Sequence, residues 1–337
     1  FLSLLVMKKL LLVIVLQLGF SLVYSQPVTE LQETAKNFMR QGDYANAILV
    51  LNRAVQMEPQ NIAVLKDLSL NLYYNGDYDK ALETLKPVLE MPQADDQSFQ
   101  IAGSIYRQSG RPEDAEKMYR KGLKKFPQSG ILFNDLGEVQ WRLQSKEAIK
   151  NWEKGIEAEP SYSRNYFNAS RYYYYTGNTV WGLLYAEIFL NMDPFGPNAP
   201  EIKQLLLDGY KQLFKQANIE LGNTNKNPFV IQYLQCMNKQ SALASTGINT
   251  SSLAMIRARF VLDWFANSKN FPYRLFEYQQ QLLREGLFDA YNQWLFGTVQ
   301  SLPAYQNWTN THADESKTFY NFQKSRVFKI PNGQYYH

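Results

Sequence analysis

Residues 99–127 of the chain read FQIAGSIYRQSGRPEDAEKMYRKGLKKFP, and this stretch decides the fold. Its small residue Gly103 and its turn residue Gly110 both recur along the chain at intervals of 34 residues. The turn glycines are Gly42, Gly76 and Gly110, and the small residues are Ala35, Ser69, Gly103 and Gly137. A fixed period of this length predicts a stack of repeats, each of which is one supersecondary unit.

A second set of small residues keeps the same step, at Ala47, Ala81 and Ala115, with Ala148 one residue early. Small side chains at two places in each unit predict two helices that approach each other closely. Glycine tolerates the positive φ of a turn after a helix end, and a proline such as Pro127 ends the second helix because it lacks an amide donor. One such hairpin cannot bury both of its faces, so neighbouring hairpins must stack.

This pattern resembles the tetratricopeptide repeat, whose signature is W-x2-L-G-x2-Y, then A-x3-F, then P. The residues that carry the resemblance are Phe99, Ala102, Gly103, Tyr106, Ala115, Tyr119 and Pro127 in one repeat and Phe133, Leu136, Gly137, Ala148, Trp152 and Pro160 in the next. The departures are Pro92, which comes one residue early, Gly182 in place of an alanine, and Gln140 in place of an aromatic residue. The resemblance implies an all-α, right-handed α-α superhelix with repeats at 28–61, 62–95, 96–129, 130–162 and 163–196.

The remaining residues, 197–337, are predicted to form a helical extension of the same body. Apolar residues continue at helical spacing over residues 201–217 and 252–267, although the 34-residue register fades. Residues 273–299 fit either one degenerate repeat or an unrelated helical cap. The aromatic-rich end of the chain is predicted to pack back onto the stack, because a solenoid needs a cap.

The first 25 residues have the pattern of a signal peptide. Lys8 and Lys9 precede an apolar stretch at 10–19, and Ser25 stands before a plausible cleavage site at Gln26. We therefore expect export to the periplasm or beyond the cell, and no integral membrane span after cleavage. The alternative is a retained membrane anchor, for which the apolar stretch is short.

Composition and motifs argue against several classes of function. The formal net charge of +4 comes without a dense basic face, so nucleic acid is not an expected partner. His312 and His337 lie in polar surroundings, and the spacings of zinc sites, nucleophile elbows and phosphate loops do not occur. The single cysteine, Cys236, reads as a small core residue on a helix. We expect no catalytic residue, no metal and no cofactor, and the chain is not expected to be an enzyme.

In a stack of hairpins the first helix of each repeat turns one stripe to its partner helix and the opposite stripe to the concave groove. In the fourth repeat this leaves Ile131, Asn134, Glu138 and Trp141 facing the groove. Aromatic residues and arginine are enriched at binding hot spots. The predicted partner-binding residues are Tyr73, Tyr74, Arg107, Trp141, Arg164, Phe167, Arg171, Tyr174 and Tyr175. The alternative is that the carboxy-terminal half folds over the groove and makes these residues internal packing.

The expected function is that of a non-catalytic scaffold of the periplasm or cell envelope, which binds a partner protein or peptide in the groove. The alternative is a structural subunit of an envelope-associated assembly that uses its convex face. Some members of the family clamp a terminal carboxylate with lysine, asparagine and arginine. Leu70 and Ser104 stand where that clamp needs polar amides, so this ligand is not carried over.

Overall fold

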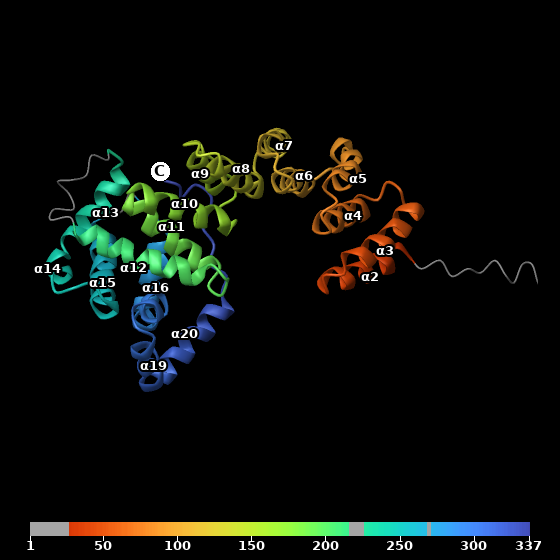
Figure 1. Ribbon diagram of the computed structural model, residues 1–337. Helices are drawn as coiled ribbons and strands as arrows, with labels where there is room; N and C mark the ends of the chain where they lie inside the picture. Colours follow the sequence, from red (N-terminus) through yellow and green to blue (C-terminus); the bar gives the residue numbers. More distant parts are fainter. Residues whose placement is uncertain (1–26, 216–225, 268–270) are drawn as a thin grey trace, which may run out of the picture. The chain divides into compact units, whose positions relative to one another are not determined.

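The computed structural model describes residues 27–215, 226–267 and 271–337, and the predicted signal peptide lies outside them. The chain divides into two compact units, unit 1 up to Ala94 and unit 2 from Asp95 to His337. The described residues form helices joined by turns and loops, without a β-strand (Figure 1). The predicted all-α class is therefore confirmed. The boundary between the units falls inside the predicted five-repeat array, at the junction where Pro92 comes one residue early.

Unit 1 consists of two helical hairpins. Its helices are α2 (Val28–Arg40), α3 (Tyr44–Met57), α4 (Ile62–Tyr74) and α5 (Tyr78–Glu90). The side chains of Asp43 and Asn61 accept hydrogen bonds from backbone N–H groups in the first turns of α3 and α4, which fixes where these helices begin. Ala47 and Ala81 are fully buried, as the closest approach of two helices requires.

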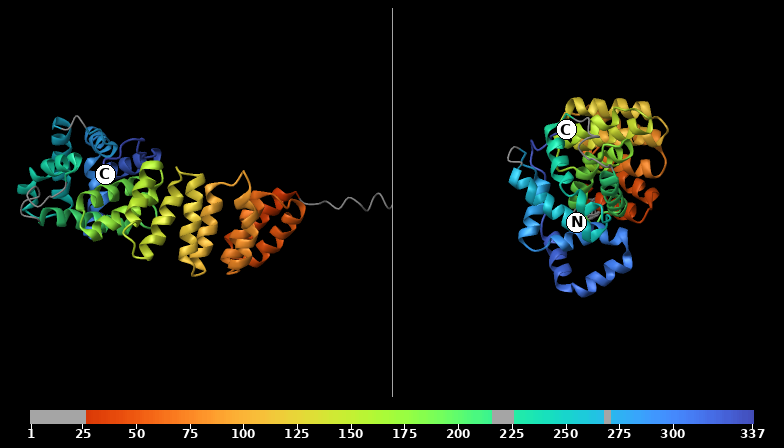
Figure 2. Two further views of the ribbon diagram at one scale, coloured as in Figure 1. Left: turned by 90° about the horizontal axis from the view of Figure 1, so that it is seen from above. Right: turned by 90° about the vertical axis from the view of Figure 1, so that its left-hand side faces the viewer.

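Unit 2 begins with three further hairpins, whose paired helices lie side by side (Figure 2). Their helices are α6 (Asp96–Gln108), α7 (Pro112–Lys125), α8 (Gly130–Arg142), α9 (Ala148–Ala158), α10 (Ser163–Thr176) and α11 (Thr179–Met192). A Cβ atom on Gly103 would overlap the ring of Tyr119, and one on Gly137 would overlap the indole of Trp152. Large aromatic side chains therefore pack directly on glycine, so the sequence needs both members of each pair.

The turn inside each hairpin places one residue in the left-handed region. Gly76 has φ +88° and Gly110 has φ +78°. One period after Gly110 stands Gln144, and its φ is +57°, the one positive φ of a non-glycine residue in the described ranges. The fourth hairpin therefore keeps the backbone geometry of its neighbours without the residue that suits it.

The carboxy-terminal part of unit 2, from α12 to α20, consists of helices and the connections between them. Its elements are α12 (Ala199–Lys215), α13 (Pro228–Asn238), α14 (Ser241–Ala244), α15 (Thr250–Asn267), α16 (Arg274–Arg284), α17 (Phe288–Asn292), the π-helical turn η1 (Gln293–Gly297), α18 (Thr298–Gln300), α19 (Leu302–Thr311) and α20 (Ala313–Ser325). Helices α16 and α17 pack together as a hairpin with Gly286 at the turn. This hairpin is compatible both with a degenerate repeat and with an unrelated helical cap at residues 273–299.

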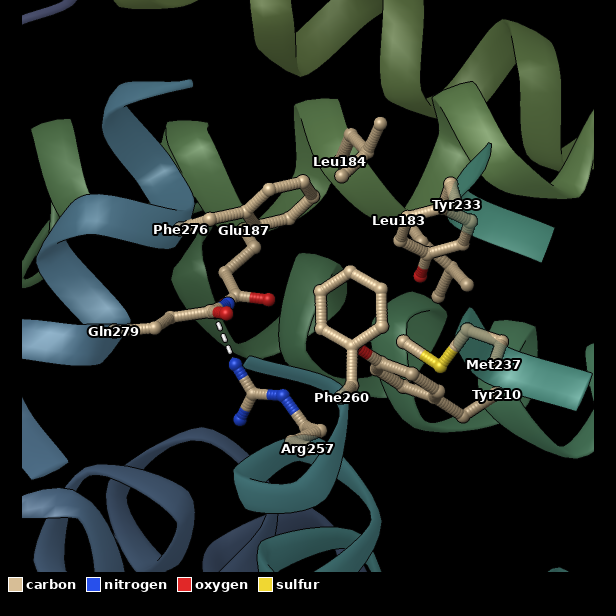
Figure 3. Close-up of a pocket in the computed structure, with 10 residues that line it drawn as sticks. All are labelled: Leu183, Leu184, Glu187, Tyr210, Tyr233, Met237, Arg257, Phe260, Phe276 and Gln279. Carbon is tan, nitrogen blue, oxygen red and sulfur yellow. Dashed lines mark hydrogen bonds and ion pairs between the residues drawn. The ribbon is translucent and has the colours of Figure 1, made fainter. Parts of the chain in front are cut away.

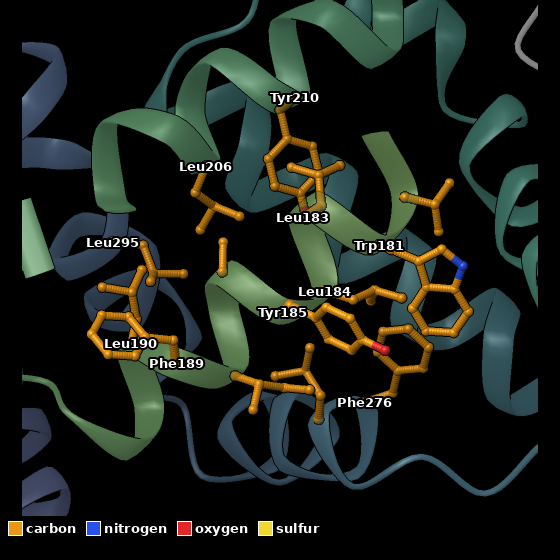
Figure 4. Packing of buried hydrophobic residues seen from close by; sticks show 14 of the residues in the cluster. Trp181, Leu183, Leu184, Tyr185, Phe189, Leu190, Leu206, Tyr210, Phe276 and Leu295 are labelled. Carbon is orange, nitrogen blue, oxygen red and sulfur yellow. The ribbon is translucent and has the colours of Figure 1, made fainter. Parts of the chain in front are cut away.

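Helix α11 is the centre of the hydrophobic core of unit 2. Twelve of its fourteen residues are buried, so it is surrounded rather than amphipathic. Figure 4 shows its leucine and aromatic side chains between Tyr210 of α12 and Phe276 of α16. Cys236 of α13 is buried in the same core, as the sequence predicted. The fifth hairpin is therefore covered by the carboxy-terminal helices.

This core also contains a buried ion pair between Glu187 of α11 and Arg257 of α15, whose side chains are 3% and 1% exposed. Gln279 Nε2 and Tyr291 Oη each donate a hydrogen bond of 2.7 Å to the same Glu187 oxygen. Arg257 also donates to Asn292. Figure 3 shows the guanidinium directed toward Glu187 and Gln279, beside the rings that enclose it. A buried carboxylate needs such donors, because it loses its hydration.

Candidate functional site

The first helices of the hairpins of unit 2 lie next to one another, and α12 continues the row. We call the side chains that join these four helices the polar ladder. Its members are Gln100 and Arg107 of α6, Asn134, Asp135 and Glu138 of α8, Asn168 and Arg171 of α10, and Glu201 of α12. Most of its bonds join residues about one repeat apart.

The bonds of the polar ladder are short and run from helix to helix. Arg107 Nη1 lies 2.7 Å from Glu138 Oε2, and the two side chains are 22% and 25% exposed. Asn168 Nδ2 donates to Asn134 Oδ1 at 2.8 Å. Arg171 Nε lies 2.8 Å from Glu201 Oε1, an ion pair that is partly exposed and lacks hydrogen-bond geometry. Polar networks with satisfied partners rigidify the elements that they join, so the ladder holds α6, α8 and α10 in register.

Asp135 is the most deeply buried charged member of the ladder, with 5% of its surface exposed. Its two oxygens accept hydrogen bonds from Asn134 Nδ2 at 2.9 Å and Gln100 Nε2 at 3.0 Å. Burial raises the pKa of the Asp135 carboxyl above its usual range, and the nearby Glu138 carboxylate adds to the rise. Arg107 bonds to Glu138, so Asp135 has no ion-pair partner among the described residues.

Aromatic side chains flank the ladder on α8 and α10. Trp141 is 44% exposed, and its ring meets Tyr172 edge-on with centroids 5.3 Å apart. Phe167 is half-buried against Phe189, and the Arg171 guanidinium lies 5.2 Å from the centroid of the Phe167 ring. Such rings present rigid apolar surface beside polar groups, which is the composition of binding hot spots.

The structure places the predicted partner-binding residues in two groups. Tyr73 and Tyr74 belong to unit 1, where Tyr74 is 48% exposed and stacks on Tyr44 at 5.4 Å. The other seven belong to unit 2, on the helices joined by the ladder: Arg107, Trp141, Arg164, Phe167, Arg171, Tyr174 and Tyr175. A groove that extends through both units stays a prediction.

Within unit 2 the predicted arginines differ in their surroundings. Arg107 and Arg171 are held by Glu138 and Glu201, whereas Arg164 is exposed and forms no ion pair with a described residue. Tyr175 is 65% exposed. The described carboxy-terminal helices therefore leave Arg164, Trp141 and Tyr175 accessible rather than burying them.

The ladder contains three residues that were not predicted from the sequence to face the groove: Asp135, Asn168 and Glu201. Asp135 stands directly after Asn134, which was assigned to the groove. A signal for Asn168 is the 34-residue step from Asn134, since two amides one period apart on neighbouring first helices can bond. Asn168 and Ser170 are both buried in α10.

The described residues hold no group of three or more histidine, cysteine, aspartate or glutamate side chains arranged to bind a metal ion. His312 stacks on Trp308 at 4.8 Å, and His337 contacts Tyr173 and Glu153 instead of a second histidine. In the same ranges no helix combines the length and apolar character that crossing a bilayer takes.

Comparison with known proteins identifies the repeats. Family models described as tetratricopeptide repeat match residues 38–105 and residues 102–148. The antiviral innate immune response effector IFIT1 of Macaca fascicularis is 25% identical over an alignment of 154 residues, and the match covers 39% of this chain and 32% of that protein. The chain thus spans about a third of the length of the curated relatives it matches.

Two solved structures show a partial likeness. A tetratricopeptide repeat protein from Parabacteroides merdae ATCC 43184 is 19% identical, with a TM-score of 0.43 over 77% of this chain and 99% of that one. A thermophilic protein of Thermus thermophilus with the same repeat is 17% identical, with a TM-score of 0.43 over 55% of this chain and 98% of that one. The two family-model matches fall on the hairpins where the residues of the signature recur, and on this basis residues 38–148 of the chain are tetratricopeptide repeats.

Proposed function

We propose that this protein is a non-catalytic scaffold that binds a partner protein or peptide through the helices joined by the polar ladder. The observation that carries the proposal is the combination of a fixed polar ladder with exposed aromatic and arginine side chains on the same helices. Repeat stacks of this kind serve as extended binding surfaces, and tetratricopeptide repeat proteins are in general non-catalytic.

The two parts of this surface contribute differently to binding. The ladder side chains already bond to one another, so they supply rigidity rather than new bonds to a partner. A rigid surface loses less entropy on binding, which favours affinity. Trp141, Tyr174 and Tyr175 supply contact area, and Arg164 supplies a cation that a carboxylate of the partner can pair with.

We further propose that the protein acts in the periplasm or cell envelope, after removal of residues 1–25. The support is the basic and apolar pattern of that segment, described above from the sequence. Mass spectrometry of the protein purified from fractionated cells tests this point. An amino terminus at Gln26 in the periplasmic fraction is the expected result, and a cytoplasmic protein that retains the segment would refute it.

Site-specific photo-crosslinking tests the binding surface in the native cell. A benzoylphenylalanine at Trp141 is expected to form crosslinks to a partner protein, because this side chain is exposed beside the ladder. The matched control is the same label at Lys124, an exposed position on the second helix α7. Equal crosslinking from both positions, or none from position 141 in a folded protein, contradicts the proposal.

Alanine at both Trp141 and Tyr174 provides the complementary loss-of-function measurement. We expect the partner identified by crosslinking to dissociate from this variant while the circular dichroism spectrum stays unchanged. Retention of that partner at wild-type affinity would show that these aromatic side chains are not part of the interface.

A further inference from the structure

The last segment of the described chain leaves the helical body and returns to it. Residues 326–337 follow α20 without forming a helix, and their end lies beside α9, α10 and α13 (Figure 1). Phe328 and Ile330 are buried on the way, with the Phe328 ring 5.2 Å from that of Tyr278 on α16. Phe328 and Ile330 thus anchor the segment on the helical body ahead of its last four residues, 334–337.

Residues 334–336 form hydrogen bonds to the helical body through both side chains and main chain, as a bound peptide does. The backbone N–H of Arg274 donates to Gln334 Oε1 at 2.7 Å, and Tyr336 Oη donates to the carbonyl of Pro272 at 2.7 Å. The Asn227 side-chain amide donates to the backbone carbonyl of Tyr336. Bonds to both main chain and side chains fix the register of an extended segment.

Two rings of the segment enter an aromatic surface. Tyr336 stacks on Phe229 of α13 with centroids 4.9 Å apart and planes 17° apart. The His337 ring lies 5.1 Å from that of Trp181 on α11 and 5.4 Å from that of Tyr173 on α10. These contacts place His337 against the fifth hairpin and Tyr336 against α13.

A buried carboxylate completes the site. Glu153 of α9 is 8% exposed and lies 3.0 Å from His337 Nε2, and it also accepts a hydrogen bond from Tyr173 Oη. Burial raises the pKa of Tyr335, and the Glu153 carboxylate adds to the rise. A carboxylate buried among rings requires donors, and the His337 ring nitrogen of the segment lies within reach of this one.

We propose that residues 334–337 are a tethered ligand in a second peptide-binding site, formed by α9, α10, α11 and α13. We call it the Glu153 site. When its own segment leaves, the site accepts an extended peptide of the same chemistry, with two adjacent aromatic residues followed by a residue that donates to the carboxylate. The site shares α10 with the surface assigned to the scaffold function. Its α10 residue, Tyr173, is buried and does not belong to that surface.

The tether sets the size of the expected effect. A short tether gives an effective concentration on the order of 1 mM, and we take a dissociation constant on the order of 50 µM for the untethered peptide. The protein's own segment then weakens the apparent binding of an added peptide by about 20-fold. Loosening the segment should therefore reveal a site that the intact chain conceals.

Fluorescence anisotropy with a labelled, amidated peptide of residues 329–337 measures this. The test protein is the full chain with Tyr336→Ala and His337→Ala, which keeps its length and its Phe328 anchor. We expect this variant to bind the peptide about 20-fold more tightly than the unchanged chain does. Adding Glu153→Gln to the variant should weaken the binding again. A control peptide with alanine in place of Tyr336 should bind weakly to both proteins.

Two results would overturn the proposal. One is a folded variant, with an unchanged circular dichroism spectrum and a cooperative melt, that does not bind the peptide. The other is equal binding by the variant and the unchanged chain. Should the double variant be misfolded, a chain that ends at Gly333 gives the same comparison, and the same two results decide it.

Discussion

Replacing Gln144 with glycine is expected to stabilise unit 2. Gln144 occupies the turn position of the fourth hairpin with φ +57°, where the second and third hairpins have Gly76 and Gly110. Its side chain is exposed, and its backbone N–H bonds to the carbonyl of Trp141 as Gly110 bonds to Arg107. The turn geometry is therefore set by the hairpin, and glutamine carries the strain of a left-handed backbone.

The magnitude follows from two opposing effects. A non-glycine residue in the left-handed region costs about 1–2 kcal/mol. Glycine loses about 0.5–1 kcal/mol more than other residues in backbone entropy on folding. The net gain for Gln144→Gly is about 0–1.5 kcal/mol, and the middle of this range, about 0.7 kcal/mol, raises Tm by about 1–3 °C in a body of this size.

Tryptophan fluorescence during urea unfolding is the assay, because all six tryptophans lie between residues 141 and 308 and so report on unit 2. The matched control is Gly110→Gln, at which a Cβ would meet nothing within 4 Å, so only backbone strain is added. This control should lose about 1 kcal/mol. A Gln144→Gly variant that is less stable than the original chain would refute the reasoning.

Three further predictions concern the interior of unit 2, and each is checked by urea unfolding. Lys203 is 9% exposed over the ring of Trp294 at 4.4 Å, and burial lowers its pKa to about 8. The unfolded chain keeps this proton up to about pH 10.5, so the free energy of unfolding rises with pH from 8 to 10.5. Lys203→Met should be more stable than the original chain at pH 7 by about 1–3 kcal/mol, and this advantage should shrink as the pH rises from 8 to 10.5. A loss of stability at pH 7 would contradict the prediction. The raised pKa of Asp135 means that the folded state binds the carboxyl proton more tightly than the unfolded state does, so the free energy of unfolding falls as pH rises through that pKa. Asp135→Asn should flatten this fall in the acid range. An unchanged dependence of stability on pH would count against this prediction. Gly137→Ala should cost about 1–3 kcal/mol because its Cβ overlaps Trp152, and a neutral effect would mean that the indole can move aside.

The architecture could be predicted from the sequence because it depends on local rules that repeat. Gly76 and Gly110 mark turns that require a positive φ, and Gly103 and Gly137 mark places where two helices pack in direct contact. Each of these constraints acts within one hairpin, so the 34-residue period alone is sufficient to predict the fold. Gln144 escaped notice because its geometry is imposed by the hairpin rather than by its own preference.

The candidate site could be predicted only in part. The stripe of Trp141 follows from helical spacing, but the bond of Arg107 to Glu138 depends on how two hairpins are rotated against each other. The pairing of Glu187 with Arg257 was out of reach for the same reason, since 70 residues separate them and no period relates them. The return of residues 334–337 was foreseen as packing, although its partner Glu153 was not.

The buried pair of Glu187 and Arg257 limits how this repeat protein can be divided. Solenoids are usually modular, because each repeat touches only its neighbours and can be cut at a junction. Here a cut after the fifth repeat would remove Arg257, Gln279 and Tyr291 together and leave the Glu187 carboxylate without them. The fifth hairpin therefore belongs to an indivisible folding module with the helices that follow it, and any truncation series should end before α10 or keep the chain through α20.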